Sequence, residues 1–343
     1  MNKIILHWCD LPERTVIKID PRFQEYLIKS AFSKVELKKE LSEILSLNRH
    51  QLRLYLTLKS NFSIKSLKKL VIFTKIPVIE VEKHITGIGR KRTKIKNPKL
   101  PFKLTTKEGI SLRSIVNSEG HIPKVIGTSM HIRVPEMEIL ENAIKYAKTI
   151  FGNFEVEIKK TKNKNTHEIF FPSVIVDSLI LAGLKRGRKS IKNPSISQDV
   201  MKAKKELQKY YLQWSFACEA ECIGKNLEIN RYVDVTDILP EFFIRKLNSG
   251  ATYKKGIPEN IQNILIGRPP NLLLGECQLL KNFGILTKPR LAVLWKAKNK
   301  RVSAGWALSI TNKKSLEIVN KEIGIPLKEK ANKLEMILSS YKR

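Results

Sequence analysis

The spacing of apolar residues divides the chain into a helical N-terminal part and a longer mixed part. Between residues 23 and 85, apolar positions recur at helical intervals in several short pieces rather than in one long helix. In the piece at 48–58, most apolar positions fall on one side of the predicted helix and leave a polar, basic side outside. That outer side carries Asn48, Arg49, Gln51 and Arg53. The pattern predicts an all-α N-terminal domain at residues 1–86, which begins with a short strand or arm that includes residues 16–20.

Several short helices joined by tight turns, with a polar and basic helix third in line, are typical of a helix-turn-helix module. The segment resembles the phage-repressor-like helix-turn-helix found at the front of some archaeal proteins, through the stretches 62–70 and 76–83. If the module binds DNA, we expect Arg49, Gln51 and Arg53 to face the groove, with Asn48 near the helix N-terminus. The alternative is a small helical bundle that makes protein contacts.

The segment 87–101 is rich in basic and chain-breaking residues and is predicted to be a linker. After it, two sets of elements follow in a similar order. The first set is a helix at 107–118, a strand at 128–134, a helix after Pro135, strands at 154–158 and 167–171, and a helix at 174–184. The second set is a helix at 200–221, a strand at 227–233, an irregular stretch at 234–270, a helix at 272–283, strands at 291–297 and 302–310, and helices at 314–323 and 328–341. Two copies of one unit imply a pseudo-symmetric domain, divided into 102–190 and 191–343.

The first helix of each copy ends in a nine-residue stretch with an acid at its eighth position. Residues 112–120 read Leu-Arg-Ser-Ile-Val-Asn-Ser-Glu-Gly, and residues 212–220 read Leu-Gln-Trp-Ser-Phe-Ala-Cys-Glu-Ala. These stretches resemble the motif of the LAGLIDADG (DOD-type) homing endonucleases, of the tandem single-chain type, and the resemblance extends over most of residues 102–343. It implies an α+β fold with two αββαββα halves and a saddle-shaped sheet that binds duplex DNA. We expect Ser129, His131 and Arg133, on the polar face of the 128–134 strand, to lie on that surface.

The motif also has a physical explanation. Two helices that pack in parallel need small residues four positions apart on their shared side, and Ser114 and Ser118 provide them in the first copy. Each helix then ends with its acid close to the other acid. Two neighbouring carboxylates repel each other unless a divalent cation lies between them, and oxygen ligands suit Mg²⁺. Such a cation can activate water for phosphodiester hydrolysis, so we expect Glu119 and Glu219 to be catalytic and metal-binding.

The second stretch departs from the motif in two places. Trp214 stands where a small residue lets the helices approach, and Ala220 replaces the glycine that ends the motif. In the alternative register Glu221 is the second acid and metal ligand, but Phe216 then takes a small position and Trp214 replaces the leading leucine. A set of helix-end carboxylates without a metal is a further alternative.

The charge of the chain indicates the class of its partner. There are 64 Lys and Arg against 32 Asp and Glu, which gives a formal net charge of +32, and the commonest partner of so positive a field is nucleic acid. No apolar run approaches the ~18 residues of a membrane span, and the first 18 residues lack the apolar core of a signal peptide. We therefore expect a cytoplasmic protein without a membrane partner. The four cysteines have neither the number nor the spacing of a disulfide framework or a zinc site.

Together these features predict a monomeric, Mg²⁺-dependent endonuclease that cuts double-stranded DNA at a specific site. Two alternatives use the same fold without this activity: a non-catalytic transcription regulator that binds DNA, and an intron maturase that binds RNA. Because the chain begins at Met1 without a splicing Cys or Ser, and ends without a His-Asn pair, we expect a free-standing protein rather than an intein.

Overall fold

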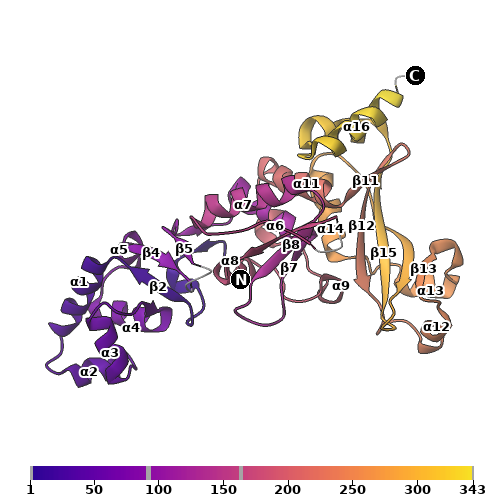
Figure 1. Ribbon diagram of the computed structural model, residues 1–343. Coiled ribbons are helices and arrows are strands. Elements are labelled where there is room, and N and C mark those ends of the chain that lie inside the picture. The colour runs from indigo at the N-terminus through magenta and orange to yellow at the C-terminus, as the bar shows by residue number, and fades with distance from the viewer. Residues whose placement is uncertain (1–2, 90–93, 162–164, 342–343) are drawn as a thin grey trace. The chain divides into compact units, whose positions relative to one another are not determined.

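The computed structural model describes residues 3–89, 94–161 and 165–341 (Figure 1). The chain forms two compact units. The first contains Met1–Gly109, Val125–His131 and Ile144–Gly183, and the second contains Ile110–Lys124, Ile132–Ala143 and Leu184–Arg343. Both units mix helices with antiparallel strands, which confirms the predicted α+β class. Across the described residues, no helix has both the length and the apolar character needed to cross a membrane.

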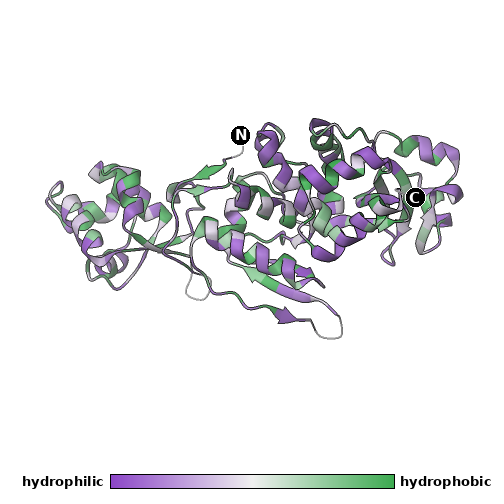
Figure 2. Cartoon of the chain, turned by 90° about the horizontal axis from the view of Figure 1, so that it is seen from above, coloured by the Kyte–Doolittle hydropathy of each residue, from purple (hydrophilic) through white to green (hydrophobic). Residues whose placement is uncertain are grey.

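The N-terminal part of the first unit contains short amphipathic helices. They are α1 (Pro21–Phe32), α2 (Lys38–Ile44), α3 (Arg49–Leu56), α4 (Ile64–Thr74) and α5 (Val78–Lys83). Side chains fix several of their starts by accepting hydrogen bonds from the free N–H groups of the first turn. Asp20 caps α1 in this way, Ser63 caps α4, and Asn48 forms a reciprocal capping box with Gln51 at α3. Hydrophilic and hydrophobic residues are interspersed along these helices in Figure 2, as expected where one side is buried.

The N-terminal domain is not all-helical, which corrects the prediction from the sequence. The strands β2 (Val16–Ile19), β3 (Phe62–Ser63), β4 (Ile85–Ile88) and β5 (Ile95–Lys96) form a sheet of order β3-β2-β4-β5. β2 coincides with the stretch 16–20 that the sequence offered as a strand or arm, whereas β3, β4 and β5 have only two to four residues, too few for an alternating pattern to identify them. β5 and the end of β4 also fall within the predicted linker at 87–101, whose residues 90–93 lie outside the described residues.

The middle of the chain is built from short strand pairs and helices, whose residues are divided between the two units. The strand β1 (Ile5–Leu6), which precedes the short helical turn η1 (Trp8–Asp10), pairs with β6 (Phe102–Lys103). Helices α6 (Lys107–Ser118), α7 (Met137–Phe151) and α8 (Ser173–Leu181) lie close to their predicted positions. A second sheet has the order β7 (Gly120–His121), β8 (Met130–Val134), β10 (His167–Phe171) and β9 (Lys159–Lys160). The strand predicted at 154–158 is wrong, because the chain pairs only from Lys159 onward.

The second unit is organised around a five-stranded antiparallel sheet of order β11-β12-β15-β14-β13. Its strands are β11 (Ala220–Ile223), β12 (Asn226–Asp234), β13 (Gly250–Tyr253), β14 (Arg290–Lys296) and β15 (Val302–Ile310). Its helices and helical turns are α9 (Lys189–Lys192), α10 (Gln198–Met201), α11 (Lys205–Glu219), α12 (Glu241–Lys246), η3 (Lys254–Gly256), α13 (Glu259–Leu265), α14 (Asn271–Asn282), α15 (Lys313–Ile318), η4 (Val319–Ile323) and α16 (Lys328–Ser340). The stretch 234–270, predicted to be irregular, therefore contains α12, β13 and α13.

Two sheets share one strand order. In β7-β8-β10-β9 and in β11-β12-β15-β14, the strands lie in the order first, second, fourth, third along the chain, and β13 adds an edge to the longer sheet. In that longer sheet, Ile229, Leu294 and Leu308 are buried on one face. The same face carries Arg231, a charged residue at a position where an alternating strand normally places an apolar one.

Candidate active site

Two helix ends meet in the second unit, where α6 ends at Ser118 and α11 ends at Glu219. The hydroxyl of Ser114 donates a hydrogen bond to the carbonyl oxygen of Tyr211, at 2.7 Å, and Asn117 Nδ2 donates to the Tyr211 hydroxyl, at 3.1 Å. A short side chain reaches the backbone of another helix only where the two helices lie close together. The small residue predicted at position 114 is thus part of the contact between α6 and α11.

The side of α11 that faces α6 carries Tyr211 and Ser215, four positions apart. Ser215 on α11 and Ser118 on α6 both accept hydrogen bonds from Nη2 of Arg231, at 3.1 and 3.3 Å. Trp214 is buried. The small residue of the second helix is therefore Ser215, one position after the place that the nine-residue motif predicts, and the chain accommodates Trp214 without separating the helices.

Glu119 directly follows α6, and Glu219 is the last residue of α11. The two side chains lie close enough for the charge of Glu219 to influence the pKa of Glu119. Burial, and then the charge of Glu219, raise the pKa of Glu119 to about 7, against smaller opposite effects of Lys189 and Lys330. Burial and both glutamates likewise raise the pKa of the Cys218 thiol well above its ordinary value. The structure thus brings together the two acids that the sequence singled out.

Glu221, the alternative second acid, lies two residues beyond Glu219 in β11. It is exposed, and its partner in the strand pairing is Glu228 of β12. The helix ends at Glu219 because the chain turns directly into this strand at Ala220, whose backbone is extended. The charge of Glu219, not of Glu221, is the second-largest influence on the pKa of Glu119, after burial.

Arg231 is a functional candidate that the sequence analysis did not identify. Its guanidinium is buried, with Nη1 3.0 Å from Oε1 of Glu219 and Nε 3.0 Å from Oε2 of Glu276. Glu276, on α14, is fully buried and also accepts from the Ser215 hydroxyl. The attraction of both glutamates raises the pKa of Arg231 above its ordinary value despite burial. The sequence did contain a signal for Arg231, because in an alternating strand it falls on the same, buried face as Leu227, Ile229 and Val233. A charge on a buried face requires a charged partner.

Lys189 is the second candidate that the sequence did not single out, because it lies in a run of basic residues. Its ammonium donates a short hydrogen bond to the carbonyl oxygen of Ser118, the last residue of α6. Burial lowers the pKa of Lys189 to about 8, and the charges of Glu219 and Glu119 partly oppose that effect. The two acids therefore lie beside one half-buried lysine and one buried arginine.

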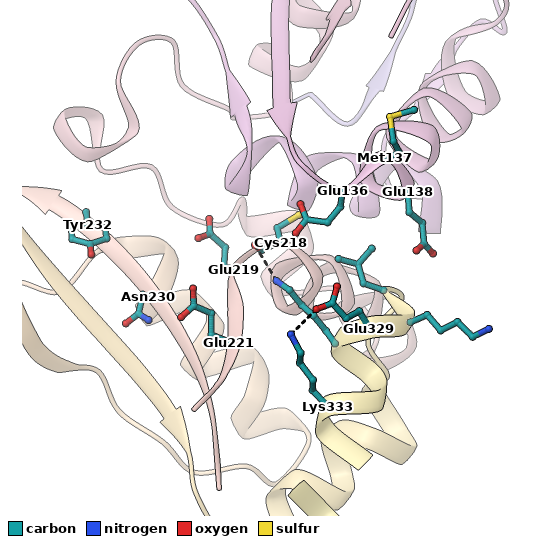
Figure 3. A pocket seen from close by; sticks show the side chains of 13 residues that line it. Glu136, Met137, Glu138, Cys218, Glu219, Glu221, Asn230, Tyr232, Glu329 and Lys333 are labelled. Carbon is teal, nitrogen blue, oxygen red and sulfur yellow. Dashed lines mark hydrogen bonds and ion pairs between the residues drawn. The ribbon is translucent and has the colours of Figure 1, made fainter. Parts of the chain in front are cut away.

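A cavity of about 770 Å³ opens beside Glu219 (Figure 3). Carboxylates and lysines line it: Glu136, Glu138, Glu219, Glu221, Glu329, Lys328, Lys330 and Lys333. Lys330 Nζ lies 3.5 Å from the Cys218 carbonyl oxygen, and Lys333 pairs with Glu329 at 2.6 Å. Charged groups of both signs around an open space suit a hydrated, charged ligand.

The donor atoms here fit a divalent cation held by few protein ligands. Among the described residues no group of three or more His, Cys, Asp and Glu side chains has the arrangement of a metal site. The Glu119–Glu219 pair nevertheless offers carboxylate oxygens. Burial, and then the charge of Glu219, raise the pKa of Glu119, and a bound cation would oppose both effects. Mg²⁺ commonly takes one or two carboxylates and completes its shell with water and phosphate oxygens.

The strand predicted to contact DNA alternates as expected. Met130, Ile132 and Val134 of β8 are buried, His131 is half-buried and Arg133 is exposed. Ser129 is half-buried and lies just before the strand. His131 Nε2 lies 3.8 Å from Oε1 of Glu168, and its ring contacts Phe170.

The four residues predicted at the helix-turn-helix surface lie on or next to α3. Arg49, Gln51 and Arg53 are exposed, and Asn48 is the N-cap. The side chains of Asn48 and Gln51 bond to each other's backbone N–H groups, at 2.8 and 3.3 Å, so their first role is to start the helix. Arg49 and Arg53 are four positions apart and line one groove with Leu52 and Leu56.

Comparison with known proteins gives distant structural similarity only. The chain matches no protein-family model, and no curated protein is significantly similar to it. It is similar to structures of mesophilic variants of the homing endonuclease I-DmoI, at 11% identity and a TM-score of 0.38, over 68% of this chain and 100% of that one. It is also similar to I-DmoI in complex with DNA and Ca, at 12% identity and a TM-score of 0.37, over 68% and 100%. Full-length DUF199/WhiA from Thermatoga maritima is 12% identical, with a TM-score of 0.36, over 70% of this chain and 64% of that one. Similarity at this level assigns neither a family nor an activity.

Proposed function

We propose that this protein is a site-specific endonuclease that hydrolyses double-stranded DNA with Glu119 and Glu219. The observation that carries the proposal is the meeting of two acids at the ends of two contacting helices, with the pKa of Glu119 raised to about 7 by burial and by the charge of Glu219. Two neighbouring carboxylates, one with a raised pKa and the other lining a polar cavity, are typical of a functional site rather than of a stabilising surface feature.

The wider architecture proposed is a tandem LAGLIDADG-type domain. Its halves, 102–190 and 191–343, would follow an N-terminal helix-turn-helix domain at 1–86 and a basic connection at 87–101. The strand order shared by β7-β8-β10-β9 and β11-β12-β15-β14 supports two halves of common design. As a single chain with two unlike halves, the protein would act as a monomer on an asymmetric site.

Each residue of the site has a part in the proposed hydrolysis. Glu119 and Glu219 would hold a divalent cation, and the chemistry that Mg²⁺ supplies is activation of water and stabilisation of the leaving phosphodiester oxygen. Arg231 fixes the carboxylate of Glu219 through a charge-assisted bond of 3.0 Å. Lys189, with a pKa lowered to about 8, places beside the two acids an ammonium group that can release its proton near neutral pH.

DNA binding is proposed for two surfaces that the sequence singled out. Ser129, His131 and Arg133 would contact the duplex from β8, and Arg49, Gln51 and Arg53 would contact it from α3. The formal charge of +32 supplies the sequence-independent attraction to phosphates. Contacts of these side chains with base edges would add specificity.

The experiment is a cleavage assay on a pool of randomised duplexes and on supercoiled plasmid, with Mg²⁺ or Mn²⁺. We expect the wild type to produce defined cuts and Glu119→Gln to produce none while keeping its affinity for duplex DNA. Tight binding of duplex DNA without cleavage by either protein would contradict the enzymatic part of the proposal.

A non-catalytic DNA-binding regulator is the second candidate, and one contact favours it. Arg231 already neutralises Glu219 from within the protein, which weakens the need for a metal cation. In that case the acids serve to position the helix ends. An RNA-binding maturase would instead show far stronger competition by RNA than by duplex DNA in the same binding assay.

A further inference from the structure

One face of the five-stranded sheet carries the core, and the opposite face, here named the open face, carries an unusual set of side chains. Residues directly opposite in an antiparallel pair share a face. Tyr232, Gly305, Val293 and Tyr253 form one row across β12, β15, β14 and β13, and Asp234, Ser303, Trp295 and Ala251 form the next. Three aromatic residues thus lie on adjacent rows of one face.

The three aromatic side chains are exposed. Tyr232 is 50% exposed, Trp295 49% and Tyr253 73%. Among the described residues the other exposed aromatics, Tyr26, Phe170 and Phe242, lie on three different elements. The open face therefore carries half of the exposed aromatic side chains of the described residues. Such a cluster exposes apolar area to water, which is typical of a binding surface.

Gly305 shapes this face. A Cβ atom at position 305 would lie 2.7 Å from Cε1 of Tyr232 and 2.6 Å from Cγ1 of Val293. The ring of Tyr232 therefore leans across β15 into space that only glycine leaves free, toward the strand that carries Trp295. The absence of a side chain at 305 places the two rings on the border of one hollow.

That hollow has a volume of about 420 Å³ and combines rings with guanidinium groups. Its lining residues are Arg188, Ser190, Tyr232, Trp295, Ala297, Arg301 and Ser303. Arg301 is held at its edge by Asp234, with Nε 2.7 Å from Oδ2. The volume lies in the range of small-ligand pockets. Flat rings suit the face of a nucleobase, and the guanidinium groups suit a phosphate.

We propose that the open face binds an unpaired nucleotide of a nucleic acid by stacking its base on Tyr232 and Trp295, with Arg188 and Arg301 on the adjoining phosphates. In an intact duplex the base faces are covered by neighbouring bases, so exposed rings find no partner there. Proteins that bind single strands combine a positively charged groove with aromatic side chains on which bases stack. Tyr253, one strand further, extends the platform to a second base.

The stacking platform lies next to the acidic site without depending on its chemistry. Tyr232 borders the 420 Å³ hollow and also lines the cavity that contains Glu219. The unpaired nucleotide would thus lie beside the proposed catalytic carboxylates. This inference goes beyond the proposed function, since it concerns the strand state of the bound nucleic acid, and it holds for a cleaving or a non-cleaving protein.

The fluorescence of Trp295 can report on binding at this face. Of the four tryptophans, Trp8, Trp214 and Trp306 are buried and only Trp295 is exposed. The full chain is titrated with a 12-nucleotide single-stranded RNA, the same sequence as single-stranded DNA, and the blunt DNA duplex, at equal salt. We expect quenching of tryptophan fluorescence by at least one single strand and no comparable quenching by the duplex. The RNA and DNA arms identify the sugar that the platform accepts.

Variants separate stacking from charge. Tyr232→Ala and Trp295→Ala should each weaken single-strand binding by about 5- to 100-fold, the range measured for stacked aromatics, and leave duplex affinity unchanged. Tyr232→Phe should bind as the wild type does, because it keeps the ring. Phe242→Ala, an exposed aromatic on α12, is the matched control and should have no effect.

Two results would overturn the proposal: equal quenching by duplex and single strands, or wild-type single-strand affinity in both alanine variants. Gly305→Ala gives an independent check, since its methyl group must displace the ring of Tyr232 and should also weaken single-strand binding. Cleavage of duplex DNA by the wild type but not by Glu119→Gln would stand even if stacking fails, so the two proposals fail separately.

Discussion

Arg231 and Glu219 form an ion pair at 3.0 Å at the end of α11, and the arginine is buried while the carboxylate is partly accessible. The same guanidinium binds Glu276, so one arginine is shared between a carboxylate of the core and a carboxylate of the cavity. This sharing fixes Glu219 where it influences Glu119, and it makes the geometry of the site depend on a charge inside the core.

Glu276→Gln should destabilise the protein. Removal of this buried carboxylate leaves the guanidinium of Arg231 with only Glu219 as an ionic partner, and breaking a buried pair typically costs about 3–5 kcal/mol. The matched control is Glu241→Gln, which breaks an exposed pair with Arg245 worth less than ~1 kcal/mol. Urea unfolding of the three proteins measures the difference, and equal losses in both variants would contradict the role given to Glu276.

Glu219→Gln and Glu221→Gln should differ in activity. If Glu219 is the second catalytic acid, its amide variant should lose cleavage on the order of 100-fold or more. Glu221 is exposed on β11 and its amide variant should cleave nearly as the wild type does. The assay is the rate of duplex cleavage under conditions in which the wild type cuts. A larger loss for Glu221→Gln would support the alternative register of the motif.

Glu119 should link stability to pH. Burial, and then the charge of Glu219, raise its pKa in the folded protein to about 7, from an ordinary value of 4.5. Between these values the folded state keeps a proton that the unfolded state has lost, so this stabilisation is complete below pH ~4.5 and is lost as the pH rises through about 7. Glu119→Gln remains neutral and should therefore be more stable than the wild type at pH 8, by on the order of 2–3 kcal/mol, and similar to it at pH 4.

Urea unfolding at pH 4, 6 and 8 measures this linkage. Glu221→Gln serves as the control, because it makes the same chemical change on an exposed strand two residues beyond Glu219. A gain in stability at pH 8 that is equal in both variants, or absent in Glu119→Gln, would refute the coupling between Glu119 and Glu219.

The exposed arginines of α3 should contribute to duplex binding. Loss of one phosphate contact reduces the slope of log affinity against log salt by about 0.9. We expect this reduction in Arg49→Ala and in Arg53→Ala, measured by fluorescence anisotropy with a mixed-sequence duplex. Lys29→Ala is the control, because Lys29 on α1 is already paired with Glu25. Unchanged slopes in both arginine variants would favour the protein-contact alternative for this domain.

Sequence patterns predicted the long elements of this fold well. The strand at 302–310 and the helix at 107–118 have the predicted bounds, because nine or more residues show a clear period of two or of 3.6. Strands such as β3 and β7 have two residues each, so no period can appear, and their positions depend on pairing with distant segments. For that reason the sequence offered only the strand at 16–20 of the N-terminal sheet, and not the strands with which it pairs.

The candidate site was predictable in part. The spacing from leucine to acid located Glu119 and Glu219, because both follow from local helical geometry. The Arg231–Glu276 pair joins residues 45 positions apart, and a sequence pattern can show that Arg231 points inward but not which acid it meets. Lys189 was hidden within a basic run, since only the folded structure shows which lysine of the run contacts the end of α6. Trp214, at the position where the motif has a small residue, argued against a close contact between the two helices. The structure shows that Ser215, and not residue 214, is the small residue at this contact.

The most direct test of the central claim is Mn²⁺ binding, followed by electron paramagnetic resonance with and without a mixed-sequence duplex. It requires no knowledge of the target site and stays informative in the absence of cleavage. If Glu119 and Glu219 hold a divalent cation together, the wild type and Glu221→Gln should bind Mn²⁺, and Glu119→Gln and Glu219→Gln should each lose that binding. Mn²⁺ binding that is absent from the wild type, or unchanged in Glu119→Gln, would contradict the proposed metal-dependent site.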